Sequence, residues 1–152
     1  MDRSSAPRGT CDVLLVEDNL ADANLLLWCL ADARTEFKIH VARDSEAAFE
    51  HLRAHGNPDL VLLDLNLPGR DGREILDDIR SDPRWSALPV VILTSSQAQA
   101  DIRTCTEKRA SRYLTKPLNL AGYEEIARAI EGYWLSLAEP GAPETPGTAA
   151  GG

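Results

Sequence analysis

The sequence is poor in cysteine, and it lacks long apolar runs and a secretion signal. Its 152 residues contain three cysteines, Cys11, Cys29 and Cys105, and no CxxC pair. An odd, widely spaced set argues against a disulfide framework and a cysteine-ligated zinc site, and it indicates a reducing compartment. No apolar run approaches the ~18 residues of a membrane span, and residues 1–10 have no signal-peptide core. We therefore expect a cytoplasmic protein with no membrane contact.

Positive charge and nucleotide-binding motifs are also scarce. The formal net charge is -8, so no basic face is available for the phosphates of a nucleic acid. Neither GxGxxG nor GxxxxGK[ST] occurs, which leaves a nucleotide site without support. His51 and His55 have the spacing of a helical metal pair, but no HExxH pattern accompanies them, and we interpret them as solvated side chains. A metal cation or a protein is the better-supported partner.

Short apolar runs alternate with amphipathic stretches, which is typical of a parallel sheet covered by helices. The predicted strands are Val13 to Val16, Phe37 to Val41, Leu60 to Leu63, Val90 to Leu93 and Tyr113 to Leu114. The predicted helices are Ala21 to Ala33, Ser45 to Ala54, Gly72 to Ser81, Ala98 to Lys108 and Leu120 to Leu137. We expect one domain over residues 11–138, with disordered segments at 1–10 and 139–152.

Polar residues follow four of these strands. Glu17 and Asp18 end the stretch VLLVEDN, where an apolar run meets two adjacent carboxylates. The other strands lead to Asp64, to Thr94 and to Lys116. Because ligands of an open parallel sheet lie beyond the carboxyl ends of its strands, we expect these groups to share one edge.

The chemistry of such a set points to phosphoryl transfer. Carboxylates that lie close together repel unless a hard cation separates them, and Mg²⁺ prefers oxygen ligands and phosphate. A carboxylate beside Mg²⁺ can attack a phosphoryl group and form an acyl phosphate if fixed donors meet the developing charge. Lys116 and Thr94 are such donors.

In this order, LLVEDN, LLDLNLPGRDG, VVILTSS and YLTKPLN resemble the motifs of the CheY-like receiver domains of two-component response regulators, over about residues 12 to 137. The resemblance implies an α/β, flavodoxin-like, doubly wound sheet of five parallel strands in the order 2-1-3-4-5, flanked by five helices. It also implies a signalling protein that catalyses only its own phosphorylation and dephosphorylation.

The resemblance assigns roles to individual residues. Asp64 would be the phosphoacceptor, paired with Lys116, and Thr94 and Tyr113 would be the switch residues. The Mg²⁺ ligands would be Glu17 through water, Asp18, Asp64 and the backbone carbonyl of Asn66. Glu17 replaces the Asp of many members without changing that role. The Lys116–Pro117 bond would be cis, and the pattern Pro68, Asp71, Gly72 matches the loop after the acceptor, with Gly72 present for backbone geometry.

The stretches NLADANLL, IRSDPRWSALPVVILTSS and IEGYWLSL are similar to single-domain regulators that work with phytochrome histidine kinases. Such a regulator would receive its phosphoryl group from a sensor kinase and signal through protein contacts, because no DNA-binding domain follows. The resemblance implies a homodimer through the fourth helix, the fifth strand and the final helix. Of Tyr133, Trp134 and Leu135 at least one should be exposed, although Trp134 could instead fold back onto the core. We expect Trp28 to pack in the core or at its edge.

Two alternatives use similar ingredients. Phosphatases of the haloacid dehalogenase type also combine a strand-end Asp, a Thr or Ser, a Lys and Mg²⁺. They need a second Asp two residues after the nucleophile, where this chain has Asn66, and their metal carboxylates come late in the chain. A degenerate receiver kept only for its surfaces would lack a site residue, and none is missing.

Overall fold

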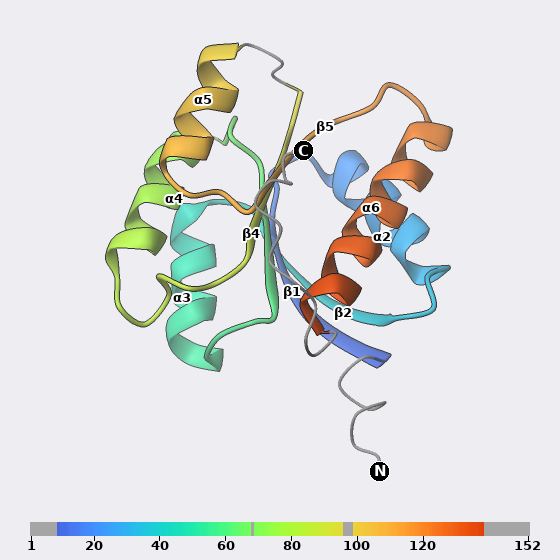
Figure 1. The fold of residues 1–152 in the computed structure, drawn as a ribbon, viewed down its shortest axis with the longest axis horizontal. Helices are drawn as coiled ribbons and strands as arrows, with labels where there is room; N and C mark the ends of the chain where they lie inside the picture. Colours follow the sequence, from blue (N-terminus) through green and yellow to red (C-terminus); the bar gives the residue numbers. More distant parts are fainter. Residues whose placement is uncertain (1–8, 68, 96–98, 139–152) are drawn as a thin grey trace.

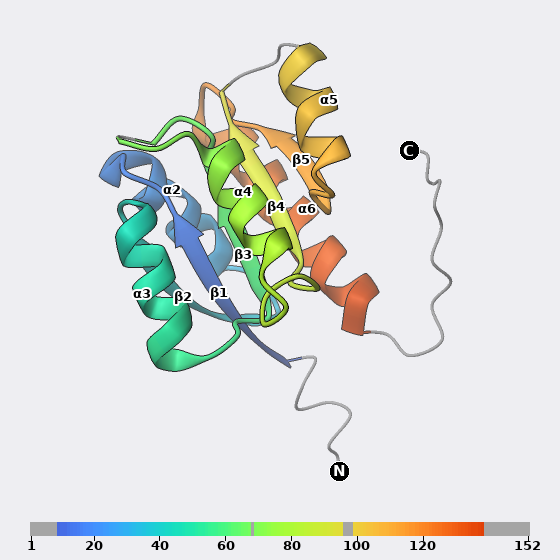
Figure 2. The same ribbon diagram turned by 90° about the vertical axis from the view of Figure 1, so that its left-hand side faces the viewer.

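Five parallel strands form an open sheet between two layers of helices in the computed structural model, which describes residues 9–67, 69–95 and 99–138 (Figures 1 and 2). The strands are β1 Thr10–Val16, β2 Glu36–Ala42, β3 Leu60–Leu63, β4 Val90–Thr94 and β5 Arg112–Thr115. The helices are α2 Leu20–Ala31, α3 Ser45–His55, α4 Gly72–Ser81, α5 Gln99–Glu107 and α6 Leu120–Ala138.

The strand order is β2-β1-β3-β4-β5, as the sequence predicted. All strand pairs are parallel, with Val13 beside Leu60 and Val61 beside Val90 at the centre of the sheet. Every residue of β3 and β4 is buried, whereas β2 and β5 at the edges are partly exposed. The central strands are apolar throughout because helices cover both of their faces.

Each face of the sheet carries its own apolar core. Helices α2 and α6 cover one face, and α3, α4 and α5 cover the other (Figure 1). On the first face Leu15 packs with Leu26 and Ile130, and on the second Leu63 packs with Ile75. Because these helices run back antiparallel to the strands, the loops after the strands gather at one edge of the sheet.

Polar residues after the strands begin the next helices. Asn19 accepts a hydrogen bond from the backbone N–H of Asp22 at 3.0 Å and caps α2. Asp44 and Asp71 cap α3 and α4 in the same way. These side chains satisfy the free N–H groups at the helix starts, which explains part of the polar pattern without any ligand.

The predicted boundaries differ from the observed ones by a few residues. β3 and α4 match, whereas β1 begins at Thr10, inside the segment assigned to the N-terminus. Outside the described residues lie Pro68, the predicted helix start at Ala98, residues 1–8 of the predicted disordered segment 1–10, and the predicted disordered segment 139–152. The cysteines are buried and free. None of the described helices has the length and apolar character to cross a membrane.

The prediction for Trp28 is wrong, because its side chain is 74% exposed. The buried face of α2 includes Leu26 and Leu30, and a residue two positions from Leu26 lies about 200° around the helix. Trp134 does pack into the core under α6 at 9% exposure, and Leu135 beside it is 37% exposed. Of Tyr133, Trp134 and Leu135, at least Leu135 is thus exposed, as expected.

Candidate phosphoryl and metal site

The neighbouring strands β1 and β3 place the acidic residues side by side. Glu17 and Asp18 follow β1, and Asp64 follows β3, the neighbour of β1 in the sheet. The N–H of Asp64 donates to the carbonyl of Val16 at 3.1 Å, and the N–H of Glu17 donates to the carbonyl of Ala42 at 2.9 Å. The strand ladder therefore continues to the acidic residues and fixes their backbone.

Glu17, Asp18 and Asp64 form an acidic cluster whose carboxylate oxygens lie within 4.8 Å of one another. Glu17 and Asp64 are buried, at 2% and 5% exposure, and Asp18 is exposed. A set of carboxylate oxygens with one side open to solvent fits a hard divalent cation that keeps some of its water.

Lys116 reaches this cluster from the end of β5. Its Nζ lies 2.7 Å from Glu17 Oε1, 2.9 Å from Asp64 Oδ2 and 3.0 Å from Asp22 Oδ2. Asp22 was not among the predicted site residues. It stands four residues after Asp18, in the first turn of α2, and only the packing of that turn against the strand ends turns it toward the lysine.

Burial and charge act against each other in this group. Burial lowers the pKa of Lys116, but hydrogen bonds to Glu17, Asp64 and Asp22 outweigh it and the net pKa is raised, so the ammonium is retained. Burial raises the pKa of Glu17 to about 7, although Lys116 opposes this shift. Lys116 thus supplies the positive charge that the strand-end carboxylates require.

Asp22 is held in turn by Tyr123 of α6. The buried Tyr123 hydroxyl interacts with the Asp22 carboxylate, and burial first and that carboxylate second raise the pKa of Tyr123 to about 12. The phenol is therefore neutral and can donate a hydrogen bond to Asp22. Tyr123 was not predicted either, because it comes from the far end of the chain and carries no motif.

Asn66 links the acceptor to Thr94. Its backbone N–H donates to Asp64 Oδ1 at 3.0 Å, and its side-chain amide donates to Thr94 Oγ1 at 3.1 Å. Thr94 is fully buried, and its carbonyl accepts from the N–H of Lys116 at 2.8 Å. Tyr113 pairs with Ile92 on β4 and packs, half-buried, against the core under α3, α4 and α5.

Two glycines hold the site loops by close approach. A Cβ on Gly72 would overlap the carbonyl oxygen of Asp64 and lie 2.6 Å from the Leu65 Cα, which confirms that this glycine serves backbone geometry. A Cβ on Gly122 would overlap the ring of Pro117, a contact the sequence did not predict.

The expectation of a cis Lys116–Pro117 bond is wrong for this structure, because the described residues contain no cis peptide bond. An X–Pro bond favours trans by about 0.5–1 kcal/mol unless its surroundings select cis. Here the trans chain already brings the Lys116 ammonium to three carboxylates.

The sequence from residue 13 to 129 matches the family model described as the response regulator receiver domain. The chain therefore belongs to the response regulator receiver family. This membership decides against the dehalogenase-type alternative.

Within that family, the chain is 37% identical to the response regulator Rcp1 of Synechocystis sp. over 140 residues, which cover 88% of this chain and 93% of Rcp1. It is 38% identical over 128 residues to the probable methanogenesis regulatory protein FilR2 of Methanothrix harundinacea, covering 81% of this chain and 83% of FilR2.

Solved structures of response regulators are also similar to this chain. The phosphorylated cyanobacterial phytochrome response regulator RcpA matches with a TM-score of 0.79 and 39% identity, covering 86% of this chain and 97% of RcpA. The Mn²⁺-bound form of Rcp1 matches with a TM-score of 0.75 and 37% identity, covering 82% and 94%. The protein is thus a receiver-type signalling protein that resembles phytochrome response regulators and has the flavodoxin-like fold.

Proposed function

We propose that this protein is a single-domain response regulator that accepts a phosphoryl group from a histidine kinase on Asp64. The observation that carries the proposal is the buried Asp64 carboxylate, held 2.9 Å from the Lys116 ammonium inside a cluster of carboxylates. The likeness of this chain to Rcp1 over nearly the full length of both chains supports a regulator made of this one domain.

In the proposed reaction, a carboxylate oxygen of Asp64 attacks the phosphorus of a phosphohistidine. The P–N bond breaks, a P–O bond forms, and the histidine nitrogen leaves with its electron pair. Lys116 stays charged and neutralises the phosphoryl oxygens as they approach two carboxylates. Asp64 is held by the N–H of Asn66 and by Lys116, so it needs little reorganisation.

We assign Mg²⁺ to the acidic cluster, with Glu17, Asp18, Asp64 and the backbone carbonyl of Asn66 as the groups that would hold it. The cation, when bound, offsets negative charge on the phosphoryl oxygens. The oxygen-only donor set fits Mg²⁺ or Mn²⁺, and the Mn²⁺-bound form of Rcp1 shows that a relative binds such an ion.

The switch is assigned to Thr94 and Tyr113. Thr94 Oγ1 now accepts from the amide of Asn66, and a phosphoryl group on Asp64 would offer the hydroxyl a charged acceptor instead. Movement of Thr94 alters the end of β4, which pairs with β5 and so with Tyr113. The face formed by α5, β5 and α6 is then the surface that changes.

The proposed partner is a phytochrome histidine kinase in the cytoplasm, and RcpA, a phytochrome response regulator, supports this choice. Apolar side chains are exposed beside the site. Leu20 follows the acidic loop and Leu118 follows Pro117, and both are more than half exposed. Trp28 and Leu120 are also exposed and line one apolar pocket between α2 and the start of α6, and this surface suits an apolar face of the kinase.

We further propose a homodimer through α5, β5 and α6. Leu135 and Leu137 near the end of α6 are 37% and 41% exposed, and Arg112 of β5 lies over the Tyr133 ring at 4.7 Å. Light scattering of the phosphorylated and the unphosphorylated protein tests the proposed dimer. We expect a dimer that Leu135→Glu dissociates and that Leu20→Glu, on another face, leaves intact. A native monomer at high concentration in both states would contradict the dimer.

Intact mass tests the phosphorylation directly. The protein is incubated with a small acyl-phosphate donor and Mg²⁺, and released phosphate is measured in parallel. We expect one phosphoryl addition that disappears in Asp64→Asn and with a chelator. Asp59→Asn, at the opposite end of β3, is the matched control and should be modified like the native protein. Failure of the native protein to gain a phosphoryl group would refute the proposal.

A further inference from the structure

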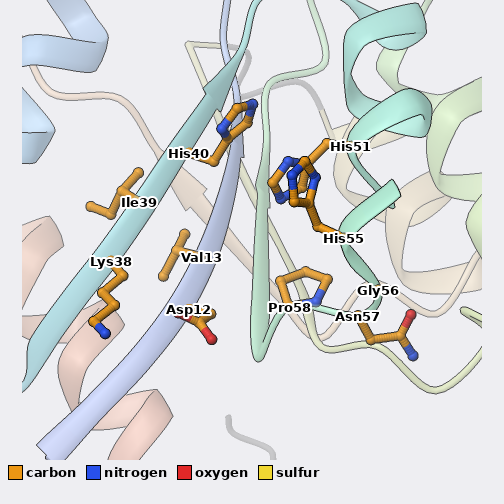
Figure 3. Close-up of a pocket in the computed structure, with 10 residues that line it drawn as sticks. All are labelled: Asp12, Val13, Lys38, Ile39, His40, His51, His55, Gly56, Asn57 and Pro58. Carbon is orange, nitrogen blue, oxygen red and sulfur yellow. The ribbon is translucent and has the colours of Figure 1, made fainter. Parts of the chain in front are cut away.

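All three histidines of the chain meet in one place outside the phosphoryl site. His40 comes from β2, and His51 and His55 come from α3 (Figure 3). The His40 and His51 rings stack with their centroids 4.0 Å apart, and the His51 and His55 rings stack at 4.5 Å. The third pair, His40 and His55, is separated by 6.5 Å. We refer to these residues as the histidine cluster.

The fold brings the three side chains to one face of the sheet. His40 pairs in register with Leu14, which belongs to the core under α3, so His40 points to the same face. His51 and His55 are four residues apart and occupy one side of α3. The sequence shows only the helical pair His51 and His55, because nothing in the spacing indicates that α3 covers His40.

His51 has an unsatisfied polar atom at the centre of the cluster. Its Nδ1 is buried and has no hydrogen-bond partner among the described residues, whereas buried polar nitrogens in proteins are nearly always bonded. Burial, together with the neighbouring imidazoles of His40 and His55, lowers the pKa of His51. The ring is therefore neutral at physiological pH and keeps a lone pair, which is the form of imidazole that ligates a metal.

The surroundings also favour a cation. The histidine cluster lines a cavity of about 330 Å³ that extends to Asp12 of β1 (Figure 3). His55 is the last residue of α3, where the helix dipole is negative. Lys38 of β2 also lines this cavity, but it lies at the Asp12 end, away from the histidine cluster, and pairs in register with Asp12 (Figure 3).

We propose that His40, His51 and His55 bind one transition-metal cation of the Zn²⁺ type through three imidazole nitrogens, with a fourth position left for water. Nitrogen ligands suit Zn²⁺, Ni²⁺ and Cu²⁺, whereas the oxygen-only acidic cluster suits Mg²⁺ and Mn²⁺. Stacked rings do not direct their lone pairs at one point, so the rings turn about their side-chain torsions when the metal enters. The metal would join edge strand β2 to α3.

Calorimetric titration of the full chain with Zn²⁺ at pH 7.5, in saturating Mg²⁺, tests this site. We expect one Zn²⁺ per chain, and we expect ring NMR signals of all three histidines to shift together. His40→Gln, His51→Gln and His55→Gln should each weaken the binding at least about tenfold. Since His40 and His55 are exposed, their variants test the site even if His51→Gln does not fold.

Two controls separate this site from the rest of the surface. Arg53→Gln, an exposed change on α3 outside the histidine cluster, should bind Zn²⁺ like the native protein. The double variant Asp18→Asn, Asp64→Asn should also keep Zn²⁺, because it removes only acidic ligands. Absence of Zn²⁺ binding, undiminished binding in His55→Gln, or binding lost in the acidic variant would each overturn the proposal.

Discussion

Lys116 and Glu17 form a buried ion pair in which the ammonium lies 2.7 Å from the carboxylate oxygen. Lys116 follows the edge strand β5 and Glu17 follows β1, so the pair joins the ends of two strands beside Asp64. The pair couples the charge state of the metal site to that of the acceptor.

Removal of the ammonium should destabilise the fold. Lys116→Ala leaves the buried Glu17 and Asp64 carboxylates without their cation, and loss of one partner of a buried pair costs about 3–5 kcal/mol. Urea unfolding at pH 7.5 measures the free energy of unfolding. Added Mg²⁺ should recover part of the loss by binding the uncompensated carboxylates. Equal stability of the variant and the native protein without Mg²⁺ would show that the ion pair does not stabilise the fold.

Binding of Mg²⁺ should strengthen as the pH rises toward neutrality. Burial raises the pKa of Glu17 from 4.5 to about 7, so protons compete with the cation below that pH, by up to about tenfold in affinity per unit. The same shift means that protonated Glu17 stabilises the fold at pH 4.5 and below, and that this contribution is lost as the pH rises through about 7. Calorimetric Mg²⁺ titrations between pH 5.5 and 8 measure the slope. Glu17→Gln should flatten the profile, and an equally steep profile in this variant would assign the proton elsewhere.

The Thr94 hydroxyl should be needed for the response, whereas its loss should slow the phosphorylation chemistry without abolishing it. Thr94→Val keeps the shape of a fully buried side chain but removes the acceptor of the Asn66 hydrogen bond. We expect one phosphoryl addition as in the native protein, while the NMR shifts of Tyr113 no longer change on phosphorylation. The native protein must first show that the Tyr113 shifts change on phosphorylation. If they also change in Thr94→Val, Thr94 is excluded as the switch.

Alanine at Gly72 should displace the acceptor loop. The added Cβ overlaps the backbone of Asp64 and Leu65, and such crowding costs about 1–3 kcal/mol. We expect lower stability and slower phosphorylation by a small donor. Gly132→Ala is the matched control, since no atom of the described residues lies within 4 Å of a Cβ added there and alanine favours a helix by about 0.5–1 kcal/mol. Similar effects of the two substitutions would argue against the close contact at Gly72.

The exposed Trp28 should matter for the kinase and not for the fold. Trp28→Ser changes a surface side chain, so the free energy of unfolding should move by less than about 0.5 kcal/mol. Phosphotransfer from the cognate kinase should slow at least severalfold, while phosphorylation by a small donor stays unchanged. Leu135→Ser provides a comparison on the proposed dimer face. Normal transfer from the kinase would remove Trp28 from the contact.

Much of the fold could be read from the sequence because its signals are local. The apolar runs of β3 and β4 and the amphipathic pattern of α4 predict their own structure. The strand order came from the family resemblance that the motifs around Glu17, Asp64, Thr94 and Lys116 carry, since alternation of strands and helices is compatible with several orders. Strand ends were less certain, because the first residues of β1 are identified by pairing with β2 and not by their own pattern.

The sequence by itself determined that Glu17, Asp18, Asp64, Thr94 and Lys116 lie at or just after the carboxyl ends of strands in a parallel sheet, and parallel strands bring these ends to one edge. Only the tertiary structure decided what approaches that edge from other elements. It turned Asp22 toward Lys116, exposed Trp28, and brought His40 against His51 and His55. The reason is physical: a strand fixes the direction of its own side chains, but the packing of a helix on the sheet depends on contacts between residues far apart in the chain.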